Sequence, residues 1–117
     1  MMSHPNSRQR DLLAKAQGDL LVPAFEMIAE LLKKKGIESI VKMTDNSRTI
    51  TFLDKNGREC EYLCHLTPLE RPRVYRNFRM TEGDHGLRGH DFSGQFVDQV
   101  TTRIVIADFS AIFQFHV

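Results

Sequence analysis

The chain lacks several features that would narrow its function quickly. Among its 117 residues there is no tryptophan, and there are only two cysteines and two tyrosines. The formal net charge is only +1, so the protein has no long-range field to gather polyanions, and nucleic-acid binding would need a local basic patch. Hydrophobic residues make up 41% and charged residues 26% of the chain, as in an ordinary globular protein, which excludes disorder throughout.

A long hydrophobic run is also missing. Asp11, Lys15 and Asp19 interrupt the first apolar region, which leaves neither a signal-peptide core nor the ~20 apolar residues that span a bilayer. We therefore expect a cytoplasmic protein with no membrane partner. Cys60 and Cys64 fall in a predicted strand, where they lie about 13 Å apart and beyond disulfide reach, so we expect both to be reduced and half-buried.

The first third of the chain predicts a helix. Apolar residues recur at helical spacing between Leu12 and Leu32, and Gly36 can end the helix in a left-handed conformation. Pro23 has no backbone N–H to donate within a regular helix. We therefore predict that this N-terminal helix is broken near Gly18.

After Gly36 the apolar period changes from that of a helix to that of a strand. Asn56-Gly57 is the strongest hairpin signal in the chain, because both residues accept a positive φ. Proline residues at Pro68 and Pro72 mark a loop, because proline cannot donate to a sheet ladder. Four strands are predicted in this region, over residues 37–43, 48–53, 59–65 and 73–80.

The C-terminal region predicts more strand. β-branched residues are dense from Gln99 onward, and apolar residues of one parity continue from Val105 to Val117. We predict one long strand or two successive strands here, and a helix over residues 95–108 is the alternative. The fold class is therefore α+β, with the N-terminal helix packed on a mainly antiparallel sheet of about five strands. A flexible tail is expected over residues 1–6, followed by a single α+β domain over residues 7–117.

Arginines distinguish the fourth predicted strand. Arg73, Tyr75 and Arg79 share one parity, and arginine is the cation that forks onto carboxylates and phosphates and stacks on rings. A sheet face with arginines and an aromatic can hold phosphates while a base stacks on the ring, which makes RNA or DNA a candidate ligand. The small net charge disfavours that reading. The alternative is an outer face whose charges pair with acids such as Glu59 and Glu61 on a neighbouring strand.

Four glycines lie in the stretch MTEGDHGLRGHDFSG, residues 80–94, together with His85 and His90. Two imidazoles and nearby carboxylates are ligand types of a metal centre, so a small metal-dependent enzyme is a further alternative. The spacing matches no specific metal motif, and Arg88 places a cation between the histidines. We expect no bound metal and no cofactor, and we interpret residues 83–94 as a binding loop whose order the sequence does not decide.

Catalytic residues cannot be assigned. Cys64 and His65 are neighbours on a predicted strand and point to opposite faces, so they cannot form a nucleophile–base pair. Glu59 and Glu61 lie about 6.6 Å apart on one face, a separation that suits paired carboxylates, but we favour a solvated outer face for them. The sequence therefore favours a binding protein over an enzyme without deciding the matter.

Apolar residues on both parities of the C-terminal strand predict self-association. Five of the eight phenylalanines lie in the last 26 residues, and most should face the helix. Ile104, Ile106 and Ile112 lie on the opposite parity, and a strand that is apolar on both faces must be covered twice. A second copy is the nearest cover, so we expect a homodimer with these isoleucines in its interface.

These patterns favour a non-enzymatic protein-interaction module, such as an adaptor, an inhibitor or a chaperone-like protein. Its partner would be another protein, bound through the sheet face and the 83–94 loop. The expected contact residues are Arg73, Tyr75, Arg79, His85, Arg88 and His90. Neither the identity of the partner nor any substrate follows from the sequence.

Overall fold

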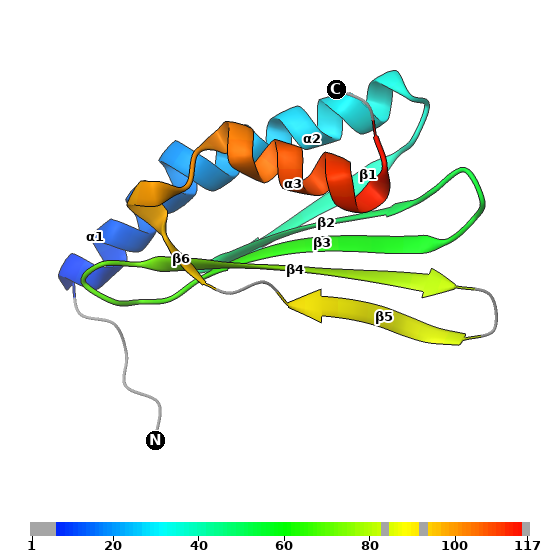
Figure 1. Ribbon diagram of the computed structural model, residues 1–117. Coiled ribbons are helices and arrows are strands. Elements are labelled where there is room, and N and C mark those ends of the chain that lie inside the picture. Colours follow the sequence, from blue (N-terminus) through cyan, green and yellow to red (C-terminus); the bar gives the residue numbers. More distant parts are fainter. Residues whose placement is uncertain (1–6, 83–84, 92–93, 116–117) are drawn as a thin grey trace.

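A layer of helices covers one face of an antiparallel sheet in the computed structural model (Figure 1). The structure describes residues 7–82, 85–91 and 94–115, with the backbone alone for 82 and 85–91, so the expected tail at 1–6 lies outside the described residues. The helical elements are α1 (Ser7–Ala16), a π-helical segment (Gln17–Leu21), α2 (Val22–Lys34), a 3₁₀ turn (Val97–Gln99) and α3 (Thr102–Phe113). The strands are β1 (Ser39–Thr44), β2 (Ser47–Leu53), β3 (Glu59–Leu66), β4 (Arg73–Glu82), β5 (His85–Asp91) and β6 (Gln95–Phe96). The predicted α+β class is confirmed.

The N-terminal helix runs without a break through α1, the π-helical segment and α2, which corrects the prediction of a break near Gly18. The chain widens there into a π turn, in which Val22 N–H donates to Gln17 O. Pro23 follows directly after this π turn, so its missing N–H falls where the regular ladder of helix hydrogen bonds is already interrupted. None of the helices in the described part of the chain is both long and apolar enough to cross a membrane.

The π turn also joins the helix to the first hairpin. The Gln17 side chain is buried, and its Nε2 donates to Thr44 O at 3.0 Å and to Ser47 O at 3.1 Å. Arg48 Nε donates to Gln17 Oε1 at 3.2 Å. One amide side chain therefore anchors the turn between β1 and β2, a contact that no local pattern predicts.

The sheet has the strand order β1-β2-β3-β4-β5, with β6 paired to the start of β4. The predicted hairpin between β2 and β3 is present, and Gly57 has φ +76°. Asp54 closes this turn by accepting from Asn56 N and Arg58 N, each at 2.9 Å, and from Arg58 Nε at 2.6 Å. Burial acts to raise the pKa of Asp54, but these hydrogen bonds outweigh it and hold the pKa below its ordinary value.

The core lies between the sheet and the helices. Alternate residues of β3 and β4 face the helices, and Tyr62 and Val74 are fully buried. Phe78 and Met80 are partly buried against the same cluster, which confirms the predicted inward parity of β4. The Phe25 and Tyr62 rings meet at a centroid distance of 6.0 Å, so α2 packs directly on the middle of the sheet.

Residues 85–91 form strand β5 and not the loop that we predicted over 83–94. β5 pairs antiparallel with β4, with Thr81 opposite Leu87 and Asn77 opposite Asp91. Glycine is depleted in strands, so the glycine content of this stretch obscured it. The strand forms because it pairs with the free backbone groups at the edge of β4, although its own strand propensity is low.

The C-terminal region forms helix α3 and not the strand that we predicted from Gln99 onward. The side chain of Thr101 caps the helix by accepting from Ile104 N–H at 3.2 Å, and Gln114 ends it in a left-handed conformation with φ +58°. Figure 1 shows α3 beside α2 on the same face of the sheet. The alternative helix over residues 95–108 had the right element type but the wrong limits.

The three isoleucines of the expected dimer interface now have a different setting. Ile106 is buried in the core, Ile112 packs partly against it, and Ile104 is 39% exposed. Because these residues lie on a helix, they do not form the second apolar face of a strand. A homodimer stays a proposal. The reason for placing these three isoleucines in its interface no longer holds.

A polar network crosses the core between the sheet and α3. Tyr62 Oη donates to Asp108 Oδ2 at 2.7 Å, and Arg76 Nη1 lies 3.6 Å from the same oxygen. Arg76 Nη2 also donates to Gln95 Oε1 at 2.7 Å. The side chains of Arg76 and Asp108 are only 11% and 15% exposed, so this ion pair ties α3 to β4 in a largely dry environment.

Candidate functional site

The helices leave one face of the sheet uncovered by any described element, and we call it the open face (Figure 1). Its residues alternate with the core residues along each strand, and cross-strand pairing brings them together. On β1 to β4 they are Ile40, Lys42, Thr49, Thr51, Leu53, Glu59, Glu61, Leu63, His65, Arg73, Tyr75, Asn77 and Arg79. This surface is mainly polar, with apolar side chains distributed across it.

One end of the open face carries an arginine–aromatic cluster, made of Arg71, Arg73, Tyr75 and Phe96. Pairing of β6 with β4 sets Phe96 opposite Arg73. The guanidinium carbons of Arg71 and Arg73 lie 3.6 Å and 4.1 Å from the centre of the Phe96 ring. Both cations are therefore held by the electrostatic attraction of the ring face.

Hydrogen bonds fix the same cluster from its sides. Arg73 Nη1 donates to Gly94 O at 3.2 Å, and Arg71 forms two hydrogen bonds with the carboxylate of Asp98 at 3.0 and 3.1 Å. The bonds from Arg71 hold the pKa of Asp98 below its ordinary value. The arginines are thus positioned before any ligand arrives.

The ring of Tyr75 packs closely against Gly94. A Cβ atom at Gly94 would come within 2.5 Å of the Tyr75 ring, so no larger residue fits there while the ring keeps this position. On its other side, the ring centroid of His65 is 6.5 Å away, and His65 Nε2 is 3.0 Å from Asn46 Nδ2. The Tyr75 ring is 38% exposed, so part of it is available to a partner.

Charges on the open face largely balance one another. Arg79 Nη1 lies 4.0 Å from Glu61 Oε1, and both side chains are partly exposed. The expected pairing of β4 arginines with acids on the neighbouring strand is therefore confirmed for this pair. Lys42 and Arg73 add positive charge and Glu59 adds negative charge, so no strong field of either sign marks the surface.

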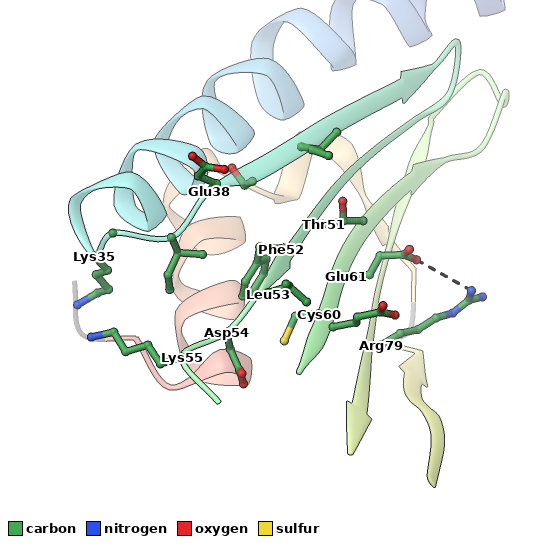
Figure 2. A pocket seen from close by; sticks show the side chains of 15 residues that line it. Lys35, Glu38, Thr51, Phe52, Leu53, Asp54, Lys55, Cys60, Glu61 and Arg79 are labelled. Atoms are coloured by element: carbon green, nitrogen blue, oxygen red, sulfur yellow. Dashed lines mark ion pairs between the residues drawn. The ribbon is translucent and has the colours of Figure 1, made fainter. Parts of the chain in front are cut away.

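A groove of about 690 Å³ opens at the other end of the sheet, where β1 begins and β2 ends (Figure 2). Figure 2 shows Lys35 and Lys55 at one side of the groove, with Glu61 and Arg79 joined by their ion pair at the other. The lining mixes cations, anions and the buried ring of Phe52. Within the described residues, no three His, Cys, Asp or Glu side chains gather in a way that could hold a metal ion.

The two cysteines are not candidate nucleophiles. Both are free thiols, as expected, but they are buried and not half-buried. Cys64 faces the core, while its neighbour His65 is exposed on the opposite face. Burial raises the pKa of Cys60 to about 11, with a further increase from nearby Asp54. Burial also raises the pKa of Cys64 to about 12, although a hydrogen bond with Tyr62 acts in the opposite direction. Neither thiol provides thiolate at neutral pH.

We therefore expect Cys60 and Cys64 to resist a thiol reagent in the folded protein at about pH 8, since the thiolate is the reactive form. Absorbance of the released chromophore measures the reaction, and the protein unfolded in guanidinium serves as the control in which both thiols react. Rapid labelling of either cysteine under native conditions would contradict this prediction.

The structure brings together three of the six predicted contact residues. Arg73, Tyr75 and Arg79 share the open face, as their parity predicted. The side chains of His85, Arg88 and His90 lie outside the described residues. The backbone positions of residues 88 and 90 pair with Met80 and Phe78, which are core-side positions of β4. Sequence reasoning missed Phe96 as a member of the cluster, because only the pairing of β6 with β4 brings it there. Arg71, which lies just before β4, was not among the predicted contact residues.

Comparisons of the chain with protein-family models, with curated proteins and with solved structures gave no match. The function has to be argued from the open face itself.

Proposed function

We propose that this protein is a non-enzymatic protein-interaction module, of the adaptor, inhibitor or chaperone-like kind, that binds another protein through the open face. The arginine–aromatic cluster is the observation that carries the proposal. Tyrosine and arginine are among the residue types that dominate interface energetics. Here they are held by ring stacking and by hydrogen bonds to Gly94 and Asp98. Such preorganisation reduces the side-chain entropy lost on binding.

The balance of charge favours a protein partner over a polyanion. The cations of Arg71 and Arg79 already face the carboxylates of Asp98 and Glu61. A phosphate would have to displace those carboxylates, whereas a protein partner can supply matching pairs at the rim of an interface. The buried free thiols fit our expectation of a cytoplasmic location, where cysteines stay reduced.

RNA or DNA stays the second candidate, and the same cluster favours it. Tyr75 and Phe96 with neighbouring arginines resemble the stacking platforms on which single strands bind. Such binding depends steeply on salt, because phosphate contacts release counterions. Titration of short mixed-sequence oligonucleotides at low and at physiological salt therefore separates the two functions.

Photo-crosslinking tests the protein-binding proposal. A photoreactive phenylalanine analogue in place of Tyr75 should capture one defined protein from an extract of the source organism. The same probe in place of Glu26, which is exposed on α2, should not capture it. Equal capture from both positions, or capture from Glu26 alone, would refute binding through the open face.

Once that protein is purified, we expect Tyr75→Ala with Arg79→Ala to weaken binding by about 2 kcal/mol or more, a loss typical of residues at the centre of an interface. Thr49→Ala on β2 is the matched control, because it shares the open face but lies away from the cluster. Titration calorimetry measures the affinities, and thermal melting should show little change, since both side chains are exposed. Unchanged affinity in the double variant would show that neither Tyr75 nor Arg79 contributes to the interface.

A further inference from the structure

Strand β1 forms an edge of the sheet, since in the described part of the chain it pairs with β2 alone. Its apolar side chains are unusually exposed: 61% for Ile40, 40% for Val41 and 66% for Met43. The strand has no proline and no bulge, and Lys42 is its only charge. Natural edge strands are protected from pairing by such features, and Lys42 is the single one that β1 carries, so the rest of this edge is open to an added strand.

The backbone of β1 has a defined set of outward groups. A two-residue turn closes the β1–β2 hairpin at the pair Thr44 and Ser47. In such a hairpin the closing pair exchanges hydrogen bonds, and bonded pairs then alternate along the ladder. The amides and carbonyls of Ser39, Val41 and Met43 therefore point away from β2.

The helix above this edge also leaves an apolar side chain uncovered. Phe25 of α2 packs on Tyr62, which in turn contacts Phe109 of α3 at a centroid distance of 5.5 Å. Met27 lies two residues further, about 200° around the helix, and so on the side of α2 that points away from Tyr62. Met27 is 55% exposed there.

We propose that a second copy of this chain pairs antiparallel with β1 about a two-fold axis at Val41, so that one sheet continues through both copies. This register sets Val41 opposite Val41 of the second copy and Ser39 opposite its Met43. The outward amides and carbonyls of Ser39, Val41 and Met43 then bond with those of the same three residues in the second copy. Ile40 meets Lys42 of the second copy, so no like charges lie opposite each other.

Charge and geometry point to a second copy as the occupant of this edge. An axis at Lys42 would oppose two lysines, whereas an axis at Val41 opposes two apolar side chains. A two-fold axis perpendicular to the sheet keeps both helical layers on one side of the continued sheet. The net charge of +1 adds little repulsion between copies. This assembly is independent of the partner proposed for the open face.

Light scattering and disulfide trapping test this interface. The wild-type protein at tens of micromolar should have twice the 13.5 kDa chain mass. Val41→Lys should raise the dissociation constant by at least about tenfold, since it places two cations at the axis. Leu53→Lys, at an apolar site on β2 that is 58% exposed, should leave the mass unchanged. Circular dichroism confirms that each variant folds.

Val41→Cys gives a second readout. Opposed Cα atoms in a bonded antiparallel pair are about 5.5 Å apart, within disulfide reach, so mild oxidation should link two copies. Leu53→Cys should stay unlinked, and the buried native thiols should not contribute. A monomeric wild type, a dimer that Val41→Lys does not weaken, or equal cross-linking at both positions would each overturn the proposal. A wild-type monomer that binds an extended peptide at β1 would assign the edge to a different partner and overturn it as well.

Discussion

Phe109→Ala should lower the free energy of unfolding by about 3–5 kcal/mol, the range for removing a fully buried phenylalanine ring. Phe109 is completely buried, and its ring lies 4.9 Å from Phe113, 5.5 Å from Tyr62 and 5.9 Å from Phe52 between centroids. The cavity would open where α3, α2 and the sheet meet. Its neighbours are themselves large rings packed on one another, so they cannot collapse easily into the space.

Guanidinium unfolding followed by circular dichroism measures this loss. Ile104→Ala is the matched control, because it truncates an apolar side chain of α3 that is 39% exposed, and we expect a clearly smaller loss. If Phe109→Ala does not fold, Phe109→Leu should still fold with a smaller loss, since it leaves a smaller cavity. A loss below about 1 kcal/mol for Phe109→Ala would mean that the ring is not central to the core.

The same residue shows why the sequence misassigned the C-terminal element. Val105, Phe109 and Phe113 are spaced by four, and residues four apart share both one face of a helix and one parity of a strand. The two periodicities therefore agree at the most conspicuous positions. The capping hydroxyl of Thr101 and the left-handed Gln114 distinguish the helix, but both are weak signals in a β-branched stretch.

The strands were predictable where local chemistry and pattern agreed. Asn56-Gly57 fixed a hairpin, and alternation placed Val74 inside and Tyr75 outside. β5 was not predictable in this way, because its glycines have low strand propensity and it depends on the edge of β4. Sequence periodicity detects a strand that buries one apolar face, and β5 has no such pattern.

The candidate site was predictable only in part, for a related reason. The shared parity of Arg73, Tyr75 and Arg79 follows from one strand. The stacking of arginine on Phe96 follows from a strand of two residues that comes soon after β5 and pairs with the start of β4. Arg76 did carry a usable signal: a charge at a core parity between Val74 and Phe78 needs a buried partner. The sequence does not show which acidic residue is that partner.

Asp108 is that acid, and Asp108→Ala should therefore destabilise the protein by about 3–5 kcal/mol, the range for breaking a buried ion pair by removing one partner. The carboxylate accepts from Tyr62 at 2.7 Å and faces Arg76 at 3.6 Å, and both charged side chains are largely buried. Without it, Arg76 keeps the hydrogen bond to Gln95 but loses the carboxylate that faces it at 3.6 Å.

Asp108→Asn separates the charge from the hydrogen bond, because an amide oxygen can still accept from Tyr62. We expect a smaller loss than for alanine. Tyr62→Phe alone should cost about 1 kcal/mol, and in combination with Asp108→Ala it should cost less than the sum, since both variants remove the same hydrogen bond. Asp98→Ala, which breaks the exposed pair with Arg71, is the matched control and should leave the unfolding midpoint unchanged. Equal midpoints for the Asp108 and Asp98 variants would show that the network between α3 and β4 does not hold the helix in place.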